Sequence, residues 1–182
     1  LARGWAVAMI GYTLAPQARI ADITAEIAAA ANTVAKLGSG PLRLAGHSAG
    51  GHLVARMMCR DVPLSDQAAQ RLDRVVSVSG LHDLRPLRRL AKNQTWGLDE
   101  AAAAAERRFR LRPRAGIALA CIAGAGERPE FIRQNALLPL AWQGLGTSAC
   151  SRLLAGDHHF SVIDHLADRD SDLCKAIDLA SP

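Results

Sequence analysis

Residues 42–54 read Leu-Arg-Leu-Ala-Gly-His-Ser-Ala-Gly-Gly-His-Leu-Val, and this stretch decides the fold. The run from Leu42 to Ala45 predicts a short buried strand. The following segment, residues 52–60, predicts a helix whose apolar face carries Leu53, Val54, Met57 and Met58. The chain must therefore turn sharply at residues 46–50, which form a Gly-x-Ser-x-Gly pentad. In such a turn the central serine is forced toward positive φ, and the flanking glycines let strand and helix approach closely.

The turn would place the Ser48 hydroxyl at the carboxyl end of the strand, in front of the helix N-terminus. That geometry suits a nucleophile, because the backbone N–H of Ala49 would point to the place where an oxyanion forms. The alternative is an ordinary strand-to-helix turn in which the serine caps the helix. It would not explain why residues able to assist a serine follow downstream in a suitable order.

Predicted strands and helices alternate along the rest of the chain. Apolar or β-branched runs predict strands at residues 5–10, 42–45, 74–80, 116–123 and 149–154. Helical periodicity predicts helices at residues 18–37, 52–60, 129–142 and 162–177. This alternation is typical of an α/β fold with a mainly parallel sheet, here of about five strands with helices on both faces. We expect a single domain over residues 1–182.

Residues 81–114 interrupt the alternation. They contain polar turns, a basic cluster at Arg85–Arg89 and a predicted helix over residues 98–108, but no strand pattern. An insertion of about 30 residues between two strands of a compact domain is usually functional. On the same edge of the sheet as Ser48, residues 81–114 would form a lid.

A serine nucleophile needs a base, and the base needs an acid that fixes its tautomer. Parallel sheets place their chemistry at the carboxyl ends of strands, so these partners should directly follow strands. His158 and His159 follow the last predicted strand, and the spacing does not choose between them. His47 and His52 flank Ser48, but turn geometry directs them away from its hydroxyl, which favours packing or surface roles.

Three carboxylates compete for the role of the acid. Glu127 follows the strand at residues 116–123, and its alternative role is to favour the positive N-terminus of the helix that begins at Pro129. Asp83 follows the preceding strand and is the rival acid. Asp157 is a weaker candidate, because it directly precedes the two histidines.

The composition bounds the classes of function. A net charge of +5 could indicate nucleic-acid binding, but the arginines are scattered and no aromatic residues alternate with them, so we expect no nucleic-acid partner. The four cysteines lie far apart without Cys-x-x-Cys spacing, which predicts neither a zinc site nor a disulfide framework. No signal-peptide pattern and no apolar run of about 20 residues occur, so we expect a cytoplasmic protein without a membrane partner.

Together these residues resemble the α/β-hydrolase superfamily and, within it, the kynurenine formamidase (arylformamidase) group and its esterase neighbours. Besides the pentad, the resemblance rests on Tyr-Thr-Leu-Ala-Pro at 12–16, Ser-Gly-Leu-His-Asp-Leu-Arg-Pro-Leu at 79–87, Glu-Arg-Pro-Glu-Phe-Ile-Arg-Gln at 127–134 and His-His-Phe-Ser at 158–161. It implies that His159, which precedes phenylalanine, is the base and that Glu127 is the acid.

The resemblance further implies hydrolysis of a small molecule, N-formylkynurenine, to kynurenine and formate in tryptophan catabolism. The mechanism needs no metal and no organic cofactor. A general carboxylesterase of the same fold and a catalytically incomplete domain are the alternatives, and a homodimer is left open.

The chain departs from the family pattern in two respects. Residues 109–113, Phe-Arg-Leu-Arg-Pro, replace a Ser-Pro pair, so the lid and pocket floor should differ. The His-Gly-Gly loop that supplies further oxyanion donors in the family has no counterpart, because the sequence begins at what resembles the fourth strand. We therefore expect part of a longer hydrolase of about 250 residues.

This expectation has consequences for the sheet and for activity. The strands at 5–10 and 42–45 would either pair directly or each leave an open edge. In isolation the chain should be unstable or inactive, since loss of a main oxyanion donor costs on the order of a hundredfold in rate.

Overall fold

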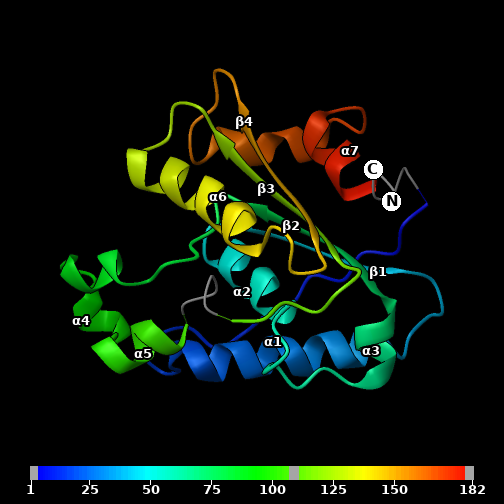
Figure 1. The fold of residues 1–182 in the computed structure, drawn as a ribbon, viewed down its shortest axis with the longest axis horizontal. Coiled ribbons are helices and arrows are strands. Elements are labelled where there is room, and N and C mark those ends of the chain that lie inside the picture. Colours follow the sequence, from blue (N-terminus) through cyan, green and yellow to red (C-terminus); the bar gives the residue numbers. More distant parts are fainter. Residues whose placement is uncertain (1–3, 107–110, 179–182) are drawn as a thin grey trace.

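A four-stranded parallel sheet forms the centre of the molecule (Figure 1). The structure is a computed structural model that describes residues 4–106 and 111–178. The strands are β1 (Leu42–His47), β2 (Leu72–Val78), β3 (Ala118–Gly124) and β4 (Ser148–Leu154). Their order in the sheet, β1-β2-β3-β4, is their order in the chain, and all three pairings are parallel. The carboxyl ends of all four strands therefore share one edge of the sheet.

Helices cover both faces of the sheet, as predicted. One face packs against α1 (Ile20–Val34), α2 (Ala49–Met57) and α6 (Pro129–Trp142), through a core that includes Val75 and Leu119. The neighbouring strand residues Val76 and Ala120 point to the other face, where they pack against the 3-10 helix η3 (Ser161–Ala167) and α7 (Asp172–Asp178). This strict alternation of side chains is the pattern of a strand buried on both sides.

The region between β2 and β3 folds on a small core of its own. It contains η1 (Pro86–Arg89), α4 (Asn93–Trp96) and α5 (Glu100–Ala105), which pack through Leu87 and Leu98 and contact Ile20 at the start of α1. Figure 1 shows α4 and α5 beside that end of α1, away from the sheet. The helix predicted over 98–108 is shorter than expected where it is described, and residues 107–110 lie outside the described residues. A lid function for residues 81–114 stays a prediction.

The strand predicted at residues 5–10 is wrong. The segment has no regular structure, and Val7, Met9 and Ile10 are exposed. An apolar run becomes a strand only where another strand accepts its backbone hydrogen bonds. Among the described residues only β2 pairs with β1, so the sheet has four strands and β1 has an open edge.

The C-terminal helix predicted over residues 162–177 is also interrupted. The chain forms η3, then a turn in which Ser171 N–H donates to the Asp168 carbonyl, and then α7. A further short helix, α3 (Asp66–Arg71), precedes β2, and the Ser65 side chain caps it by accepting from the Ala68 N–H. Of residues 109–113, where the family pattern is broken, the first two lie outside the described residues.

Candidate active site

The turn between β1 and α2 has the geometry predicted for the pentad. Ser48 has φ 54° and ψ −113°, a conformation that non-glycine residues rarely adopt. A Cβ atom at Gly46 would collide with the backbone carbonyl of Gly50, so only glycine fits there. The Ser48 N–H donates to the Val78 carbonyl at 2.8 Å, which fixes the turn to the end of β2. The half-buried Ser48 side chain is thereby held at the carboxyl edge of the sheet.

Ser48 and Glu127 each lie within hydrogen-bond distance of the His159 ring, on opposite ring nitrogens. His159 Nε2 is 3.1 Å from Ser48 Oγ, and His159 Nδ1 is 2.8 Å from Glu127 Oε2. A carboxylate can only accept, so Nδ1 carries the ring proton and donates it, while Nε2 accepts from the Ser48 hydroxyl. The structure thus brings together the three residues singled out in the sequence, in the order a serine–base–acid mechanism needs.

Glu127 is buried at the end of β3, yet its carboxylate is fully engaged. One oxygen, Oε1, accepts from the Gly124 N–H at 2.9 Å and from the Ser79 hydroxyl at 2.5 Å. The other oxygen accepts from His159. Burial of a carboxylate is tolerated where such donors replace water. These contacts differ from the alternative role of Glu127 as a partner of the α6 dipole; Glu130, in the first turn of α6, bonds Arg133 instead.

The loop that carries His159 lies directly on the end of β3. The Gly126 N–H donates to the Asp157 carbonyl at 2.8 Å, and a Cβ atom at Gly124 would collide with that same carbonyl. The Asp157 carboxylate accepts from Ser161 Oγ at 2.9 Å and from His165 Nε2 at 2.7 Å. Asp157 therefore stabilises its own loop. Its carboxylate bonds Ser161 and His165 rather than His159.

His158 differs from His159 in what its ring contacts. Its Nδ1 accepts from the backbone N–H groups of Phe160 and Ser161, at 3.2 and 3.1 Å, and the residue is exposed. This bond closes the turn before η3. Of the two histidines that the sequence left open, His159 is the one in contact with Ser48.

Comparison with known proteins shows which proteins the chain resembles. No family model matches the chain. The kynurenine formamidases of Danio rerio and Drosophila melanogaster are 26% and 25% identical to it, over 96% and 95% of this chain. The chain spans 62% of the length of either relative. Among solved structures, a candidate thioesterase from Silicibacter sp. TM1040 is 42% identical, with a TM-score of 0.91, over 98% of this chain and 66% of its own.

The chain has an α/β-hydrolase fold. Esterase B from Lactobacillus rhamnosis has the same fold at 16% identity, with a TM-score of 0.67, over 93% of this chain and 64% of its own. The proteins that the chain resembles are thus formamidases and esterases.

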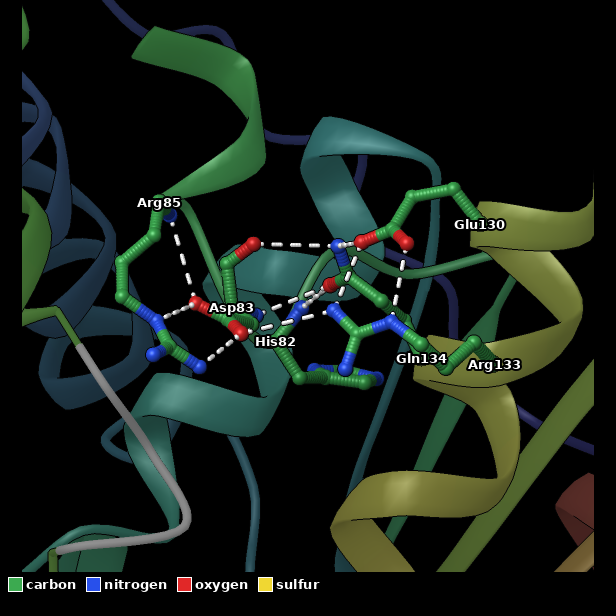
Figure 2. Close-up of polar contacts among 6 residues, drawn as sticks. All are labelled: His82, Asp83, Arg85, Glu130, Arg133 and Gln134. Carbon is green, nitrogen blue, oxygen red and sulfur yellow. Dashed lines mark hydrogen bonds and ion pairs between the residues drawn. The ribbon is translucent and has the colours of Figure 1, made fainter.

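The rival acid, Asp83, is used elsewhere in this α/β-hydrolase (Figure 2). Its buried carboxylate accepts from Arg85 Nε at 2.8 Å and Nη2 at 2.6 Å, and Arg133 Nη2 lies 3.4 Å away. Burial raises the pKa of Asp83, but the hydrogen bonds from Arg85, with further help from Arg133, outweigh burial and hold the pKa below its usual value. Gln134 accepts from the Asp83 N–H at 2.8 Å and donates to its carbonyl at 3.0 Å. Asp83 therefore fastens the inserted region to α6.

A second histidine contacts the candidate site, and sequence reasoning missed it. His47, expected to be a packing or surface residue, donates through Nε2 to the His159 carbonyl at 2.7 Å, and the two ring centroids lie 4.7 Å apart. Burial lowers the pKa of His47, and the neighbouring His159 ring lowers it further, although the bond to the carbonyl opposes this. Phe131 and Phe160 also contact the His159 ring, at centroid distances of 4.3 and 5.2 Å. The predicted base is thus held between three rings.

The inserted region is attached to the helix behind Ser48. Arg56, buried on α2, donates to Glu106 Oε2 at 2.9 Å and to both oxygens of Asp61. His52 lies 3.4 Å from the same Glu106 oxygen and bonds the Leu81 carbonyl through Nδ1 at 2.7 Å. His52 is thus a buried packing residue, as the sequence suggested.

Other features of the described residues bear on the remaining sequence predictions. Ala49 begins α2 and is exposed, but its role as an oxyanion donor stays a prediction. In the part of the chain that the structure describes, no group of three or more His, Cys, Asp or Glu side chains is arranged to hold a metal. Within the same residues, no helix is long and apolar enough to cross a bilayer. A cavity of about 420 Å³ lies beside Arg60 and Arg114, and its lining includes none of the predicted site residues.

Proposed function

We propose that this α/β-hydrolase uses Ser48 as the nucleophile for hydrolysis of an aryl formamide, with N-formylkynurenine as the substrate. The observation that carries the proposal is the chain of hydrogen bonds from Ser48 through His159 to Glu127. A serine hydroxyl attacks a carbonyl only when a base removes its proton, and this geometry supplies the base and fixes its tautomer.

The proposed reaction proceeds in two halves. His159 takes the Ser48 proton as the oxygen attacks the formyl carbon, and the Ala49 N–H stabilises the oxyanion that forms. His159 then gives the proton to the departing aryl amine, which leaves a formylated serine. A water molecule, activated by His159 in the same way, releases formate and restores Ser48. Glu127 stabilises the imidazolium in both halves.

The choice of an aryl substrate has two supports. The kynurenine formamidases are similar to this chain over nearly all of its length. In addition, Phe131 and Phe160 flank the His159 ring, and Phe160 is 73% exposed. Aromatic rings attract one another in tilted or edge-to-face arrangements, so an aryl leaving group would find apolar contacts next to the base that protonates it.

A general carboxylesterase is the second candidate, favoured by the structural likeness to esterases. A domain that is incomplete for turnover is the third. It is favoured by the fact that the chain spans only 62% of the kynurenine formamidases, because further oxyanion donors would have to lie outside the matched segment.

A fluorophosphonate probe followed by peptide mass spectrometry would separate these candidates. The sequence alone predicts an inactive chain, but the Ser48–His159–Glu127 contacts form within it, so we expect the probe to modify Ser48 in the wild-type chain. Turnover of N-formylkynurenine should then exceed that of p-nitrophenyl acetate by about tenfold or more in kcat/KM. The reverse preference would identify a carboxylesterase, and labelling without turnover of either compound would identify the incomplete domain. Failure to label Ser48 would overturn its role as nucleophile.

A further inference from the structure

Ser79, directly after β2, has a positive φ like that of Ser48. Its φ is 50°, and it and Ser48 are the two non-glycine residues with positive φ among residues 4–106 and 111–178. The Ser79 N–H donates to the Ile122 carbonyl at 2.7 Å, and the residue is fully buried. Residues held in such sparsely populated conformations cluster at functional sites.

The conformation directs the Ser79 hydroxyl onto the predicted acid. Ser79 Oγ lies 2.5 Å from Glu127 Oε1, within the range of a charge-assisted bond from a hydroxyl to an ionised carboxylate. The Gly124 N–H donates to the same oxygen, so Oε1 has two donors and Oε2 is left to His159. Because Ser79 is fully buried, its hydroxyl rather than bulk solvent supplies this hydrogen bond in the intact chain.

We propose that Ser79 is a positioning residue for the hydrolytic reaction, acting on His159 through Glu127. The inference rests on the proposed function in taking Glu127 as the acid. The Ser79 hydroxyl fixes the rotation of the carboxylate so that Oε2 faces the ring. It also draws negative charge toward Oε1, which weakens the hold of Oε2 on the imidazolium. Without the hydroxyl, the carboxylate would hold the imidazolium more strongly, and the base would become free only at higher pH.

Two substitutions separate the hydroxyl from the backbone. Ser79→Gly removes the hydroxyl and relieves the positive φ, whereas Ser79→Ala removes the hydroxyl and keeps the Cβ in the unfavourable conformation. Ser77→Ala is the matched control. Ser77 is equally buried on β2, but its hydroxyl donates to the Gly51 carbonyl at 3.2 Å and not to Glu127.

The rate of fluorophosphonate labelling is measured as a function of pH for all three variants, together with thermal unfolding. We expect both Ser79 variants to label about tenfold more slowly at neutral pH. The pH midpoint of labelling should rise by about half a unit in both. The two variants should differ in thermal stability but agree in labelling, and Ser77→Ala should match the wild type. A labelling loss that follows thermal stability, or an unmoved midpoint, would overturn the proposal.

A second readout does not depend on Ser48 chemistry. The pH midpoint of the His159 ring signals in NMR should rise in both Ser79 variants and stay unchanged in Ser77→Ala. If the wild-type chain is not labelled, the proposed nucleophile fails, while this titration still decides the role of Ser79. Unmoved ring signals in both variants would reject the positioning role even where Ser48 is labelled.

Discussion

Ser48 and Ser79 end neighbouring parallel strands with nearly the same φ, 54° and 50°, and they lie at opposite ends of one chain of hydrogen bonds. The chain runs from Ser48 to His159, from His159 to Glu127, and from Glu127 to Ser79. Ser48 is half-buried and bonds to an imidazole, whereas Ser79 is sealed and bonds to a carboxylate.

The difference between the two serines bears on the proposed role of Ser48 as the nucleophile. Both turns impose an uncommon backbone conformation and aim the hydroxyl at a titratable group. A hydroxyl facing a neutral imidazole nitrogen can transfer its proton there and meets substrate from the open side. A hydroxyl enclosed against a carboxylate can only donate its hydrogen bond. The partner of the hydroxyl and its exposure, rather than backbone strain, therefore distinguish the proposed nucleophile Ser48 from the buried Ser79.

The largest effect is expected at the open end of this chain of bonds. Ser48→Ala removes the attacking oxygen and should lower kcat/KM for ester or formamide hydrolysis by a factor on the order of 10⁴ or more. Circular dichroism should show an unchanged fold. Ser161→Ala is the control. It removes a hydroxyl that donates to Asp157 in the His159 loop, and it should retain most activity. Retained activity in Ser48→Ala would contradict the proposal that Ser48, unlike Ser79, is the nucleophile.

The next effect is expected at Glu127, the residue that joins the two halves of the comparison. Glu127→Gln keeps the shape of the side chain but supplies a donor where His159 Nδ1–H needs an acceptor, which favours the wrong ring tautomer. Turnover should fall by about 10³-fold or more, measured as kcat on the better substrate. The loss should exceed that of Ser79→Gly by a wide margin. A smaller loss than for Ser79→Gly would mean that Ser79 acts by a route other than Glu127.

The smallest effect on turnover is expected at Asp83, outside the chain of bonds. Asp83→Asn should change kcat/KM by no more than about threefold, but lower the free energy of unfolding by about 1–2 kcal/mol, because Arg85 and Arg133 lose the negative charge and one of the two acceptor oxygens of Asp83. Urea unfolding measures the second effect. Loss of Ser48 labelling in Asp83→Asn would instead return Asp83 to the role of acid.

The stability effect of Asp83 should depend on pH. The pKa of Asp83 is lowered in the folded chain, so its contribution is complete above the unfolded value, near 4, and is lost as pH falls through the folded value. The difference in unfolding free energy between wild type and Asp83→Asn should therefore shrink as the pH falls below about 4. Asp164→Asn, which removes an exposed carboxylate, is the matched control.

Much of the fold and the contacts of Ser48 were predictable from sequence for a local reason. Parallel strands bring their carboxyl ends to one edge, so residues that directly follow buried runs must meet there. This rule and the family resemblance were enough to select Glu127 and His159 from the sequence. Helices on both faces of the sheet were predictable because the strand segments are apolar on both sides and must be covered on both.

The remaining features depend on contacts that a local pattern does not encode. The run at residues 5–10 has strand composition, but whether it pairs is decided by its neighbours, and it is irregular and exposed here. His47 acquires its place from the backbone of His159, 112 residues away in sequence. The Ser-Gly pair at residues 79–80 is visible in the sequence directly after a predicted strand. Its role becomes apparent only from the positive φ of Ser79 and from the bond of Ser79 to Glu127.

The order of the strands also governs when the site can be completed during synthesis. The sheet grows from β1 to β4 in chain order, so each new strand leaving the ribosome can join the strand made just before it. The Ser48–His159 contact spans 111 residues and belongs to the last strand-to-helix connection. Among the described residues, the bond that fixes the Ser48 turn needs only the pairing of β1 with β2, whereas the contact of Ser48 with His159 also needs β4 and the loop after it.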